Sequence, residues 1–502
     1  MSFIQLAGRD GDSFQVPTGL FIDNSFLPSK EGAELEVLNP LRGAAIGNLS
    51  AAQPSDVDAA VISATRAFES SWKQTTPVTR GSLLLRLADL IERDQAQFAT
   101  IHSIDAGFVY DDVLAVDIPQ SISTLRYYAG WAGKLCGKNI DFPGGFGITR
   151  REPFGVCAAI IPWNAPLMVT IWKLAPAIAA GNVLIIKSPE LAPIYGQKLA
   201  ELIVESGFPA GVVNILCGQG SVAGSAIAHH MGIRKVAFTG STLTGRSVLR
   251  ASADSNLKKV SLELGGKSPS IVFDDADLDN ALQWTLLGST ANNGQICALG
   301  SRIYVQAGIY DAFLREFKAR VESLSSKQGD PLAAGVNKGP IISGAQYKKI
   351  ATYIDGAKDE GAQLLTGGAS QAIGSSGFVQ NTYFTDVRED MTVVKHEVFG
   401  PVSTIHRFST EDEVIRKANA SDYGLSAAVF TENVHTASRV AQALEAGHVT
   451  VNVWAMMVPN MPFGGVKQSG FGRDLGEDAL DEWTYLKAVK YAIRSGSGKS
   501  HL

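Results

Sequence analysis

The chain has 502 residues, of which 45% are apolar and 19% are charged, and its net charge is −5. A chain of this length is expected to form two or three domains, and the absence of any run of like charge argues against nucleic acid or a membrane surface as a partner. Four cysteines stand far apart with no C-x-x-C pair, a pattern that indicates neither a disulfide framework nor a zinc site and favours a reducing compartment: Cys136, Cys157, Cys217 and Cys297.

The first regular series of predicted elements begins at residue 156. Continuous apolar segments predict strands at 156–161, 182–187, 212–218 and 234–240, and the segments after them predict helices at 167–180, 195–206, 222–230 and 243–253. Apolar strands that alternate with amphipathic helices are typical of a parallel sheet covered on both faces.

A second series follows the segment 258–266. It predicts strands at 270–273, 302–306, 424–430 and 448–453, with helices at 278–290, 310–325, 345–360 and 435–445. We therefore expect a second α/β domain. Residues 131–152 and 484–494 fit neither series and are candidates for a small additional sheet.

The two ends and one apolar segment bear on location. The N-terminal MSFIQLAGRD becomes charged too early for a signal peptide, and the uncharged segment 156–172 contains Pro162 and Pro166, which argue against a lipid-spanning helix. We expect a cytoplasmic protein. The last three residues, Ser500 to Leu502, resemble the peroxisomal S-K-L address with histidine in place of lysine, which leaves a peroxisomal location open if the source is a eukaryote.

Several turns after predicted strands could bind an anion or a ribose. FTGST (238–242) offers backbone N–H groups and Ser241 at a helix start. The glycines at 218, 220 and 224 lack the spacing of the dinucleotide fingerprint, so an ordinary strand–helix turn is an equal alternative. Lys187 and Glu190, in KSPE, stand at a strand end, where α/β sheets bind ligands; the alternative is a solvated ion pair.

Three residues have the chemistry of an acyl-transfer site. Cys297 stands in the polar, glycine-rich stretch NGQICALGSR, which favours a nucleophile, although most free cysteines are small buried apolar residues. Glu263 follows an apolar strand, where burial would raise its pKa toward that of a general base, unless it points to the surface. Asn164 lies between two prolines and could stabilise an oxyanion or simply form a turn.

The motifs PWNAPL, KSPE, FTGST, LELGGKSP, GQICALGSR, EVFGP and PFGGVKQSGFGRDLG occur in this order. In that order and at these separations they resemble the NAD(P)-dependent aldehyde dehydrogenase superfamily, from about residue 21 to the C-terminal strand. The resemblance implies an α/β fold with a Rossmann-like cofactor domain, a second α/β catalytic domain and a small β oligomerisation arm. The corresponding residues are 1–130 with 154–262 for the first, 263–465 for the second, and 131–153 with 480–502 for the arm.

The resemblance also implies roles. Cys297 would attack the aldehyde to give a thiohemiacetal and then a thioester, Asn164 and the Cys297 N–H would hold the oxyanion, and Glu263 would activate the hydrolytic water. Residues matching family cofactor positions, or lying beside them in the same turns, are Trp163, Lys173, Lys187, Glu190, Gly220, Gly224, Phe238, Gly240, Ser241, Leu264, Glu397 and Phe399. Glu190 favours NAD over NADP, because a carboxylate repels a 2′-phosphate.

The substrate channel of the family would be lined by apolar residues: Ala165, Val169, Trp172, Ala291, Trp454, Met457 and Phe463. These residues predict a medium or bulky apolar aldehyde as the small-molecule partner, aliphatic or aromatic. The family also implies a homodimer or homotetramer. Three positions depart from the family pattern: Phe108 replaces a lysine, KSPE replaces K-P-x-E, and Leu243 replaces an acidic residue.

Three other functions are alternatives for this sequence. A coenzyme A-acylating relative lacks the general-base glutamate, which is present here as Glu263. A non-catalytic structural or binding relative would lack the cysteine, glutamate or asparagine. A cysteine protease would need a partnered histidine, and His396, the nearest to a motif, has no such match.

Overall fold

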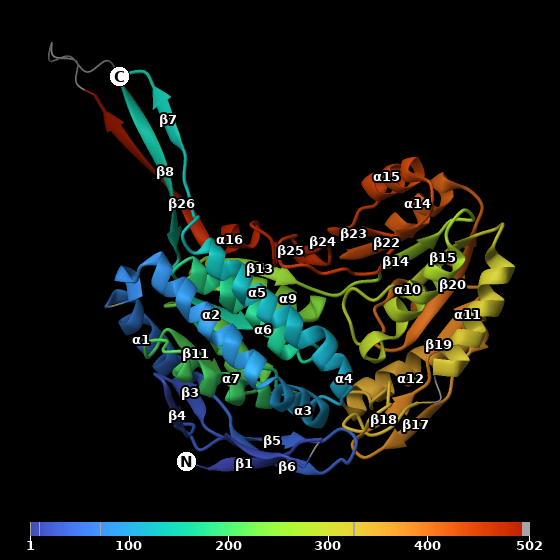
Figure 1. Ribbon diagram of the computed structural model, residues 1–502, viewed down its shortest axis with the longest axis horizontal. Coiled ribbons are helices and arrows are strands. Elements are labelled where there is room, and N and C mark those ends of the chain that lie inside the picture. The colour runs from blue at the N-terminus through green and yellow to red at the C-terminus, as the bar shows by residue number, and fades with distance from the viewer. Residues whose placement is uncertain (1, 10, 71, 325–326, 494–502) are drawn as a thin grey trace.

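The computed structural model describes residues 2–9, 11–70, 72–324 and 327–493. Two α/β halves lie side by side, each built on one large sheet, and a three-stranded arm projects from the first (Figure 1). This arrangement confirms the expected α/β fold class with two main sheets and a small third one.

The first sheet has eight strands in the order β25-β13-β12-β9-β10-β11-β3-β4. Its five central strands are parallel and almost wholly buried: β9 (Val156–Ile160), β10 (Val183–Lys187), β11 (Val213–Leu216), β12 (Lys235–Thr239) and β13 (Lys259–Glu263). Short antiparallel strands complete its edges: β3 (Leu20–Ile22), β4 (Ser25–Leu27) and β25 (Gly470–Phe471). Gly470 pairs with Glu263, so the C-terminal part of the chain closes the sheet beside that carboxyl group.

Helices cover both faces of this sheet. α6 (Pro166–Ala179) and α7 (Ile194–Glu205) connect β9 to β10 and β10 to β11, whereas α8 (Ser225–His229) leads back to β12 and α9 (Thr242–Asp254) leads on to β13. Because such crossovers are right-handed, the two pairs of helices lie on opposite faces. The order in which the chain adds strands to the sheet reverses between β9 and β12. Open α/β sheets bind ligands at the carboxyl ends of the strands beside such a reversal.

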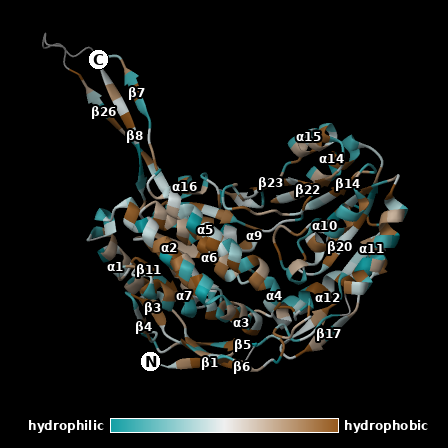
Figure 2. Cartoon of the chain, in the orientation of Figure 1, coloured by the Kyte–Doolittle hydropathy of each residue, from teal (hydrophilic) through white to brown (hydrophobic). Residues whose placement is uncertain are grey.

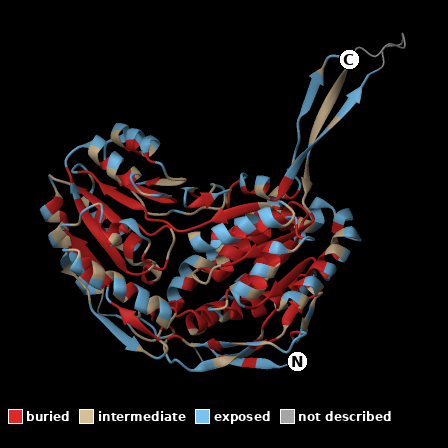
Figure 3. Cartoon of the chain, turned by 180° about the vertical axis from the view of Figure 1, so that it is seen from behind, coloured by how far each residue is buried: buried red, intermediate tan, exposed pale blue. Residues whose placement is uncertain are grey.

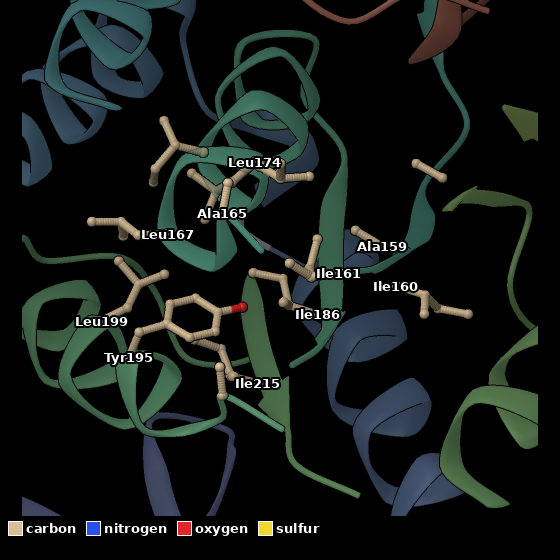
Figure 4. Close-up of a cluster of buried hydrophobic side chains, with 14 of the residues drawn as sticks. Ala159, Ile160, Ile161, Ala165, Leu167, Leu174, Ile186, Tyr195, Leu199 and Ile215 are labelled. Carbon is tan, nitrogen blue, oxygen red and sulfur yellow. The ribbon is translucent and has the colours of Figure 1, made fainter. Parts of the chain in front are cut away.

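Helix α6 is buried at every residue except Met168. It packs on β9 and β10, while α2 (Pro77–Arg93) and α5 (Ile118–Trp131) cover its other side. Figure 4 shows Leu174 of α6 in the same cluster of buried hydrophobic side chains as Ile186 and Tyr195. Burying each such aliphatic side chain contributes about 1.5–3 kcal/mol. This packing anchors the segment from β9 into α6, which carries Asn164.

The second sheet has seven strands in the order β16-β19-β20-β15-β14-β22-β23, of which β16 alone is antiparallel to its neighbour. Its strands are β14 (Pro269–Val272), β15 (Arg302–Gln306), β16 (Gln363–Thr366), β19 (Thr382–Thr385), β20 (Val402–Phe408), β22 (Ser426–Phe430) and β23 (His448–Val451). Its longer helices are α10 (Leu278–Thr290), α11 (Tyr310–Leu324), α12 (Gly344–Asp359), α14 (Glu411–Asn419) and α15 (Val434–Ala443).

The N-terminal residues wrap around both halves. The hairpins β1 (Phe3–Ala7) with β2 (Ser13–Pro17) and β5 (Glu34–Leu38) with β6 (Ala45–Ser50) run beneath the molecule in Figure 1. α1 (Pro54–Glu69) packs on the first sheet, and α3 (Gln95–Asp105) packs on α7. Arg9 reaches the second half through a hydrogen bond from its Nε to the Leu332 carbonyl.

The arm consists of β7 (Asn139–Phe142), β8 (Gly145–Pro153) and β26 (Thr484–Ala492), with β8 in the middle. Residues from both unassigned segments therefore meet in one antiparallel sheet, as the sequence suggested. Figure 3 shows that most of the arm is exposed, and Figure 2 shows hydrophobic bands along it. Its exposed apolar side chains include Ile140, Leu486, Tyr491 and Ile493.

Most predicted elements of the two series are present within a few residues. The helix expected at 222–230 is instead a turn of π-helix at 220–224 followed by the short α8, and the central strand β20 was not predicted. Among the described residues, no helix is both long enough and apolar enough to span a bilayer. The C-terminal tripeptide 500–502 lies outside the described residues.

Candidate active site

A cleft of about 950 Å³ opens at the carboxyl ends of β9, β10, β12 and β13. Residues of the second half, among them Cys297, Gln346 and Glu397, form part of its wall. The cleft therefore lies where the strand order of the first sheet reverses and where the two halves meet. This is the position at which open α/β sheets bind cofactors.

Eleven of the twelve predicted cofactor residues line this cleft. They are Trp163, Lys187, Glu190, Gly220, Gly224, Phe238, Gly240, Ser241, Leu264, Glu397 and Phe399. All three residues proposed for chemistry, Asn164, Glu263 and Cys297, also line it. Residues up to 236 positions apart in the chain thus converge on one cavity.

Two features of the cleft suit the phosphates and ribose of a dinucleotide. Glu190 accepts hydrogen bonds from Lys187 Nζ (2.5 Å) and from the Gly220 N–H (3.1 Å). Ser241 caps α9 by accepting a hydrogen bond from the Thr244 N–H at 3.3 Å, so the positive end of that helix dipole faces the cleft. Lys187 holds the pKa of Glu190 below its usual value despite burial, so the group carries negative charge at neutral pH.

A second carboxyl group, that of Glu397, lines the cleft from the other half of the molecule. The Glu397 carboxylate accepts a hydrogen bond from the Gly266 N–H at 3.0 Å, and a Cβ at Gly265 would lie 2.5 Å from its Oε2. A side chain at position 265 would therefore displace the Glu397 carboxyl group from this position. Burial raises the pKa of Glu397 to about 7. Phe399 has a left-handed backbone (φ 58°) and packs edge-on against Trp163, with ring centroids 5.2 Å apart.

Cys297 lies at the end of a tightly held loop. It follows α10 and the short 3-10 turn η4 (Ala291–Gly294), in which Asn292 and Asn293 both have left-handed backbones. Asn164 Nδ2 donates to the Gln295 carbonyl at 2.9 Å, and Asn292 Nδ2 donates back to the Asn164 carbonyl at 3.1 Å. An amide nitrogen has two hydrogens, so Asn164 retains one donor for an oxyanion in the cleft.

The thiol of Cys297 is half-buried. Burial raises its pKa to about 12, and the nearby carboxyl groups of Glu397 and Glu263 act in the same direction. Since the thiolate is the nucleophile, this raised pKa favours the protonated thiol. Positive charge brought into the cleft would lower this pKa.

Glu263 is the last residue of β13 and is 6% exposed. Neither carboxyl oxygen has a hydrogen-bond partner among the described residues. Burial and the neighbouring Asp474 raise its pKa well above the usual value, while Lys173 acts in the opposite direction. Gly464, whose added Cβ would lie 2.6 Å from Oε1, leaves room for the carboxyl group. An unpartnered carboxyl with a raised pKa has the properties of a general base.

Lys173 requires a correction. It was expected to contact the cofactor, but its side chain is 2% exposed, and its Nζ forms an ion pair with Asp474 instead of lining the cleft. The physical reason is its place on α6, which is buried on nearly all sides. Its influence on the site is electrostatic, through Asp474 and Glu263.

Three of the seven predicted substrate residues gather around the thiol. Trp172, Met457 and Phe463 belong to the apolar cluster that contains Cys297, with the rings of Trp172 and Phe463 5.5 Å apart. The other four lie outside it. Ala165 and Val169 are buried in the main core, Ala291 ends α10, and Trp454 donates to the Ala298 carbonyl at 3.2 Å.

Sequence reasoning missed several residues of the site. Gln346 and Lys349 line the cleft from α12, while Met168, Ile296 and Leu425 join the apolar cluster. Asp474 pairs with Lys173 across 301 positions. The i, i+3 spacing of Gln346 and Lys349 places them on one helix face, a weak signal. Ile296 and Asp474 stand in the motifs GQICALGSR and PFGGVKQSGFGRDLG but were given no role there. No local pattern marked the remaining residues.

Comparison with known proteins agrees with this geometry. A model described as the aldehyde dehydrogenase family matches residues 26–489. An aldehyde dehydrogenase of Davidiella tassiana is 48% identical over 498 residues, 99% of each chain. The NAD+ complex of an aldehyde dehydrogenase from Bacillus cereus is 41% identical, and the indole-3-acetaldehyde dehydrogenase of P. syringae in complex with NAD+ and IAA is 36% identical. Both structures have a TM-score of 0.93 and match 95% of this chain and 97% of theirs.

The chain therefore belongs to the aldehyde dehydrogenase family, and it is an enzyme of that class.

Proposed function

We propose that the protein oxidises an aldehyde to a carboxylic acid with NAD and water. The observation that carries this proposal is the convergence of a thiol, an amide with a spare N–H and an unpartnered carboxyl group on one cleft: Cys297, Asn164 and Glu263. Each of the three groups matches one demand of acyl transfer, namely a nucleophile, an oxyanion donor and a base.

The cleft suits NAD by its donor set. Ser241 and the start of α9 suit phosphate, while Glu190 and Glu397 offer carboxylates to ribose hydroxyls. The negative charge of Glu190 disfavours the extra phosphate of NADP. NAD, when bound, supplies the hydride acceptor. The related Bacillus cereus structure, a complex with NAD+, supports this assignment.

In the first half-reaction, the Cys297 sulfur bonds to the carbonyl carbon as the thiol loses its proton to solvent water. The carbonyl π bond breaks, and its oxygen becomes an oxyanion that accepts a hydrogen bond from Asn164. Collapse of this thiohemiacetal oxyanion re-forms the carbonyl and expels the aldehyde hydrogen as hydride. An acyl thioester remains on Cys297.

In the second half-reaction, Glu263 removes a proton from water. The resulting hydroxide bonds to the thioester carbon, and the carbon–sulfur bond breaks to release the acid. The sulfur then takes up the proton held by Glu263, which restores the thiol. Lys173 opposes part of the rise in the pKa of Glu263, and so favours the ionised carboxylate that acts as base. A coenzyme A-acylating relative would need no such base, which is why hydrolysis is favoured over acyl transfer.

The substrate is proposed to be a medium or bulky apolar aldehyde. The apolar side chains that cluster with the thiol, including Trp172, Met457 and Phe463, offer no charge of their own to hold an acidic or cationic group. The P. syringae relative is named for indole-3-acetaldehyde, a bulky aromatic aldehyde, and supports this class.

Self-association through the arm is also proposed, as a homodimer or homotetramer built on residues 131–153 and 480–502. The arm exposes Ile140, which is 50% exposed, and Leu486, which is 66% exposed. Its outer strands β7 and β26 each leave one edge unpaired among the described residues, and such edges are prone to pair with another chain. The division of the remaining chain into cofactor and catalytic domains at residue 262, and a cytoplasmic rather than peroxisomal location, stay proposals.

A panel of aldehydes tests the activity and the substrate class together. With NAD or NADP, the absorbance of the reduced cofactor is followed for acetaldehyde, betaine aldehyde, hexanal, benzaldehyde and phenylacetaldehyde. We expect oxidation with NAD and higher kcat/KM for the last three. Preference for acetaldehyde or betaine aldehyde would refute the substrate class, and no reduced cofactor with any aldehyde would refute the activity.

A further inference from the structure

The loop that carries Cys297 is fastened on the side away from the cleft. Gln295 is fully buried, and its Oε1 accepts a hydrogen bond from the Ile342 N–H at 3.1 Å. Asn293 is 6% exposed, and its Nδ2 donates to the Gly339 carbonyl at 2.9 Å and more weakly to the Pro340 carbonyl at 3.3 Å. Neither side chain lines the cleft. Both instead reach the segment 339–342, which we call the clasp segment.

The clasp segment is itself held firmly. The Ile341 N–H donates to the Gly377 carbonyl at 2.9 Å, and the Ser376 hydroxyl donates to the Ile341 carbonyl, both at the strand β18 (Ser376–Val379). Gly107 also lies against Pro340. The Cys297 loop is therefore tied to a fixed point of the fold.

The loop needs such ties because of its backbone. Asn292 (φ 47°, ψ 41°) and Asn293 (φ 56°, ψ 30°) are consecutive left-handed residues, a conformation that non-glycine residues adopt at a cost of about 1–3 kcal/mol each. The Gln295 carbonyl, two residues before the thiol, is also the acceptor that orients Asn164. A loop that relaxed would thus move the nucleophile and the oxyanion donor together.

We propose that Gln295 and Asn293 are positioning residues that, through the clasp segment, hold Cys297 and Asn164 in register for attack on the substrate. This inference rests on the proposed function for its catalytic consequence. Neither residue touches the substrate; each acts by fixing the loop. A displacement of about 1 Å at a reacting group can lower a rate about 100-fold.

Two variants each remove one hydrogen-bonding side chain between the Cys297 loop and the clasp segment. Asn293→Gly keeps a residue that readily adopts the left-handed backbone but removes the tether, and Gln295→Leu removes the acceptor for the Ile342 N–H. Asn214→Ala is the matched control, because Asn214 is also fully buried, donates to the Gly211 carbonyl at 3.0 Å and accepts from the Asp23 N–H at 3.0 Å, yet lies outside the cleft.

Two readouts are measured on the full-length protein. The first is the single-turnover rate of NADH formation with enzyme in excess over aldehyde. The second is the rate of Cys297 alkylation by iodoacetamide at pH 8, followed by peptide mass spectrometry. A loosened loop exposes the thiol to water and relieves the burial that suppresses its ionisation. We expect single turnover to fall 10- to 100-fold while alkylation rises at least fivefold, with NAD affinity unchanged.

A purely structural role would not move the two rates in opposite directions. Asn214→Ala is expected to lower the melting temperature without changing either rate. The proposal is overturned if Asn293→Gly keeps both rates within twofold of the parent, or if Asn214→Ala changes them equally. If Gln295→Leu does not fold, Asn293→Gly decides alone. If the parent protein oxidises no aldehyde, the proposed function fails, and the alkylation rates still decide whether the clasp holds the thiol.

Discussion

Replacing Glu263 by glutamine removes the base and preserves its shape. Three carboxyl groups line the cleft, and two are engaged: Glu190 by Lys187, and Glu397 by the Gly266 N–H. Glu263 alone has both oxygens buried without a partner among the described residues, so no other cleft carboxyl is free to replace it. A general base contributes about 10²- to 10⁴-fold, or about 3–5 kcal/mol of barrier. Hydrolysis of the thioester should slow by that factor.

The assay is stopped-flow absorbance of NADH with Glu263→Gln, NAD and a preferred aldehyde. We expect a burst equal in amount to the active sites, since hydride leaves before the base is needed, followed by the slow steady state. Cys297→Ala is the control and should give neither burst nor turnover while still binding NAD. A steady rate within threefold of the parent would refute the role of Glu263. Loss of the burst itself would mean that Glu263 acts on the thiol before hydride leaves.

Two further predictions concern charge in the cleft. Because the Cys297 pKa is raised to about 12, the rate of iodoacetamide alkylation without NAD should rise tenfold per pH unit from pH 7 to 10. NAD, whose oxidised ring is cationic, should accelerate this alkylation at pH 7. A plateau of the alkylation rate near pH 8.5 would show an ordinary thiol. Glu190→Gln should raise kcat/KM for NADP relative to NAD about fivefold to tenfold. The gain is modest because the Glu190 side chain is 40% exposed and already paired with Lys187; an unchanged ratio of kcat/KM values would contradict the role of Glu190.

The parts of the site that could be predicted from sequence are those fixed by local rules. Lys187, Phe238 and Glu263 lie in or at the end of apolar strands, and the carboxyl ends of parallel strands meet at one edge of a sheet. Predicting these strands therefore located much of the cleft wall that the first sheet provides. Cys297 and Glu397 depended on the family resemblance, because they come from a different sheet and no local pattern places them opposite the first.

The misses have non-local causes. Lys173 was expected at the cofactor only from the family resemblance, whereas its partner Asp474 comes from a segment 301 positions further along the chain. Strand β20 was overlooked because His406 and Arg407 interrupt its apolar run, although His406 is buried. The ties from Gln295 to Ile342 likewise depend on packing between distant segments.

The covalent acyl-enzyme on Cys297 offers the most direct test of the central claim. Glu263→Gln is mixed with NAD and a preferred aldehyde, quenched in acid during the slow phase and analysed by intact and peptide mass spectrometry. The account predicts a mass gain equal to the aldehyde less two hydrogen atoms, confined to the peptide that contains Cys297 and matched in amount by NADH. NADH formed without this adduct, or the adduct on another residue, would contradict it.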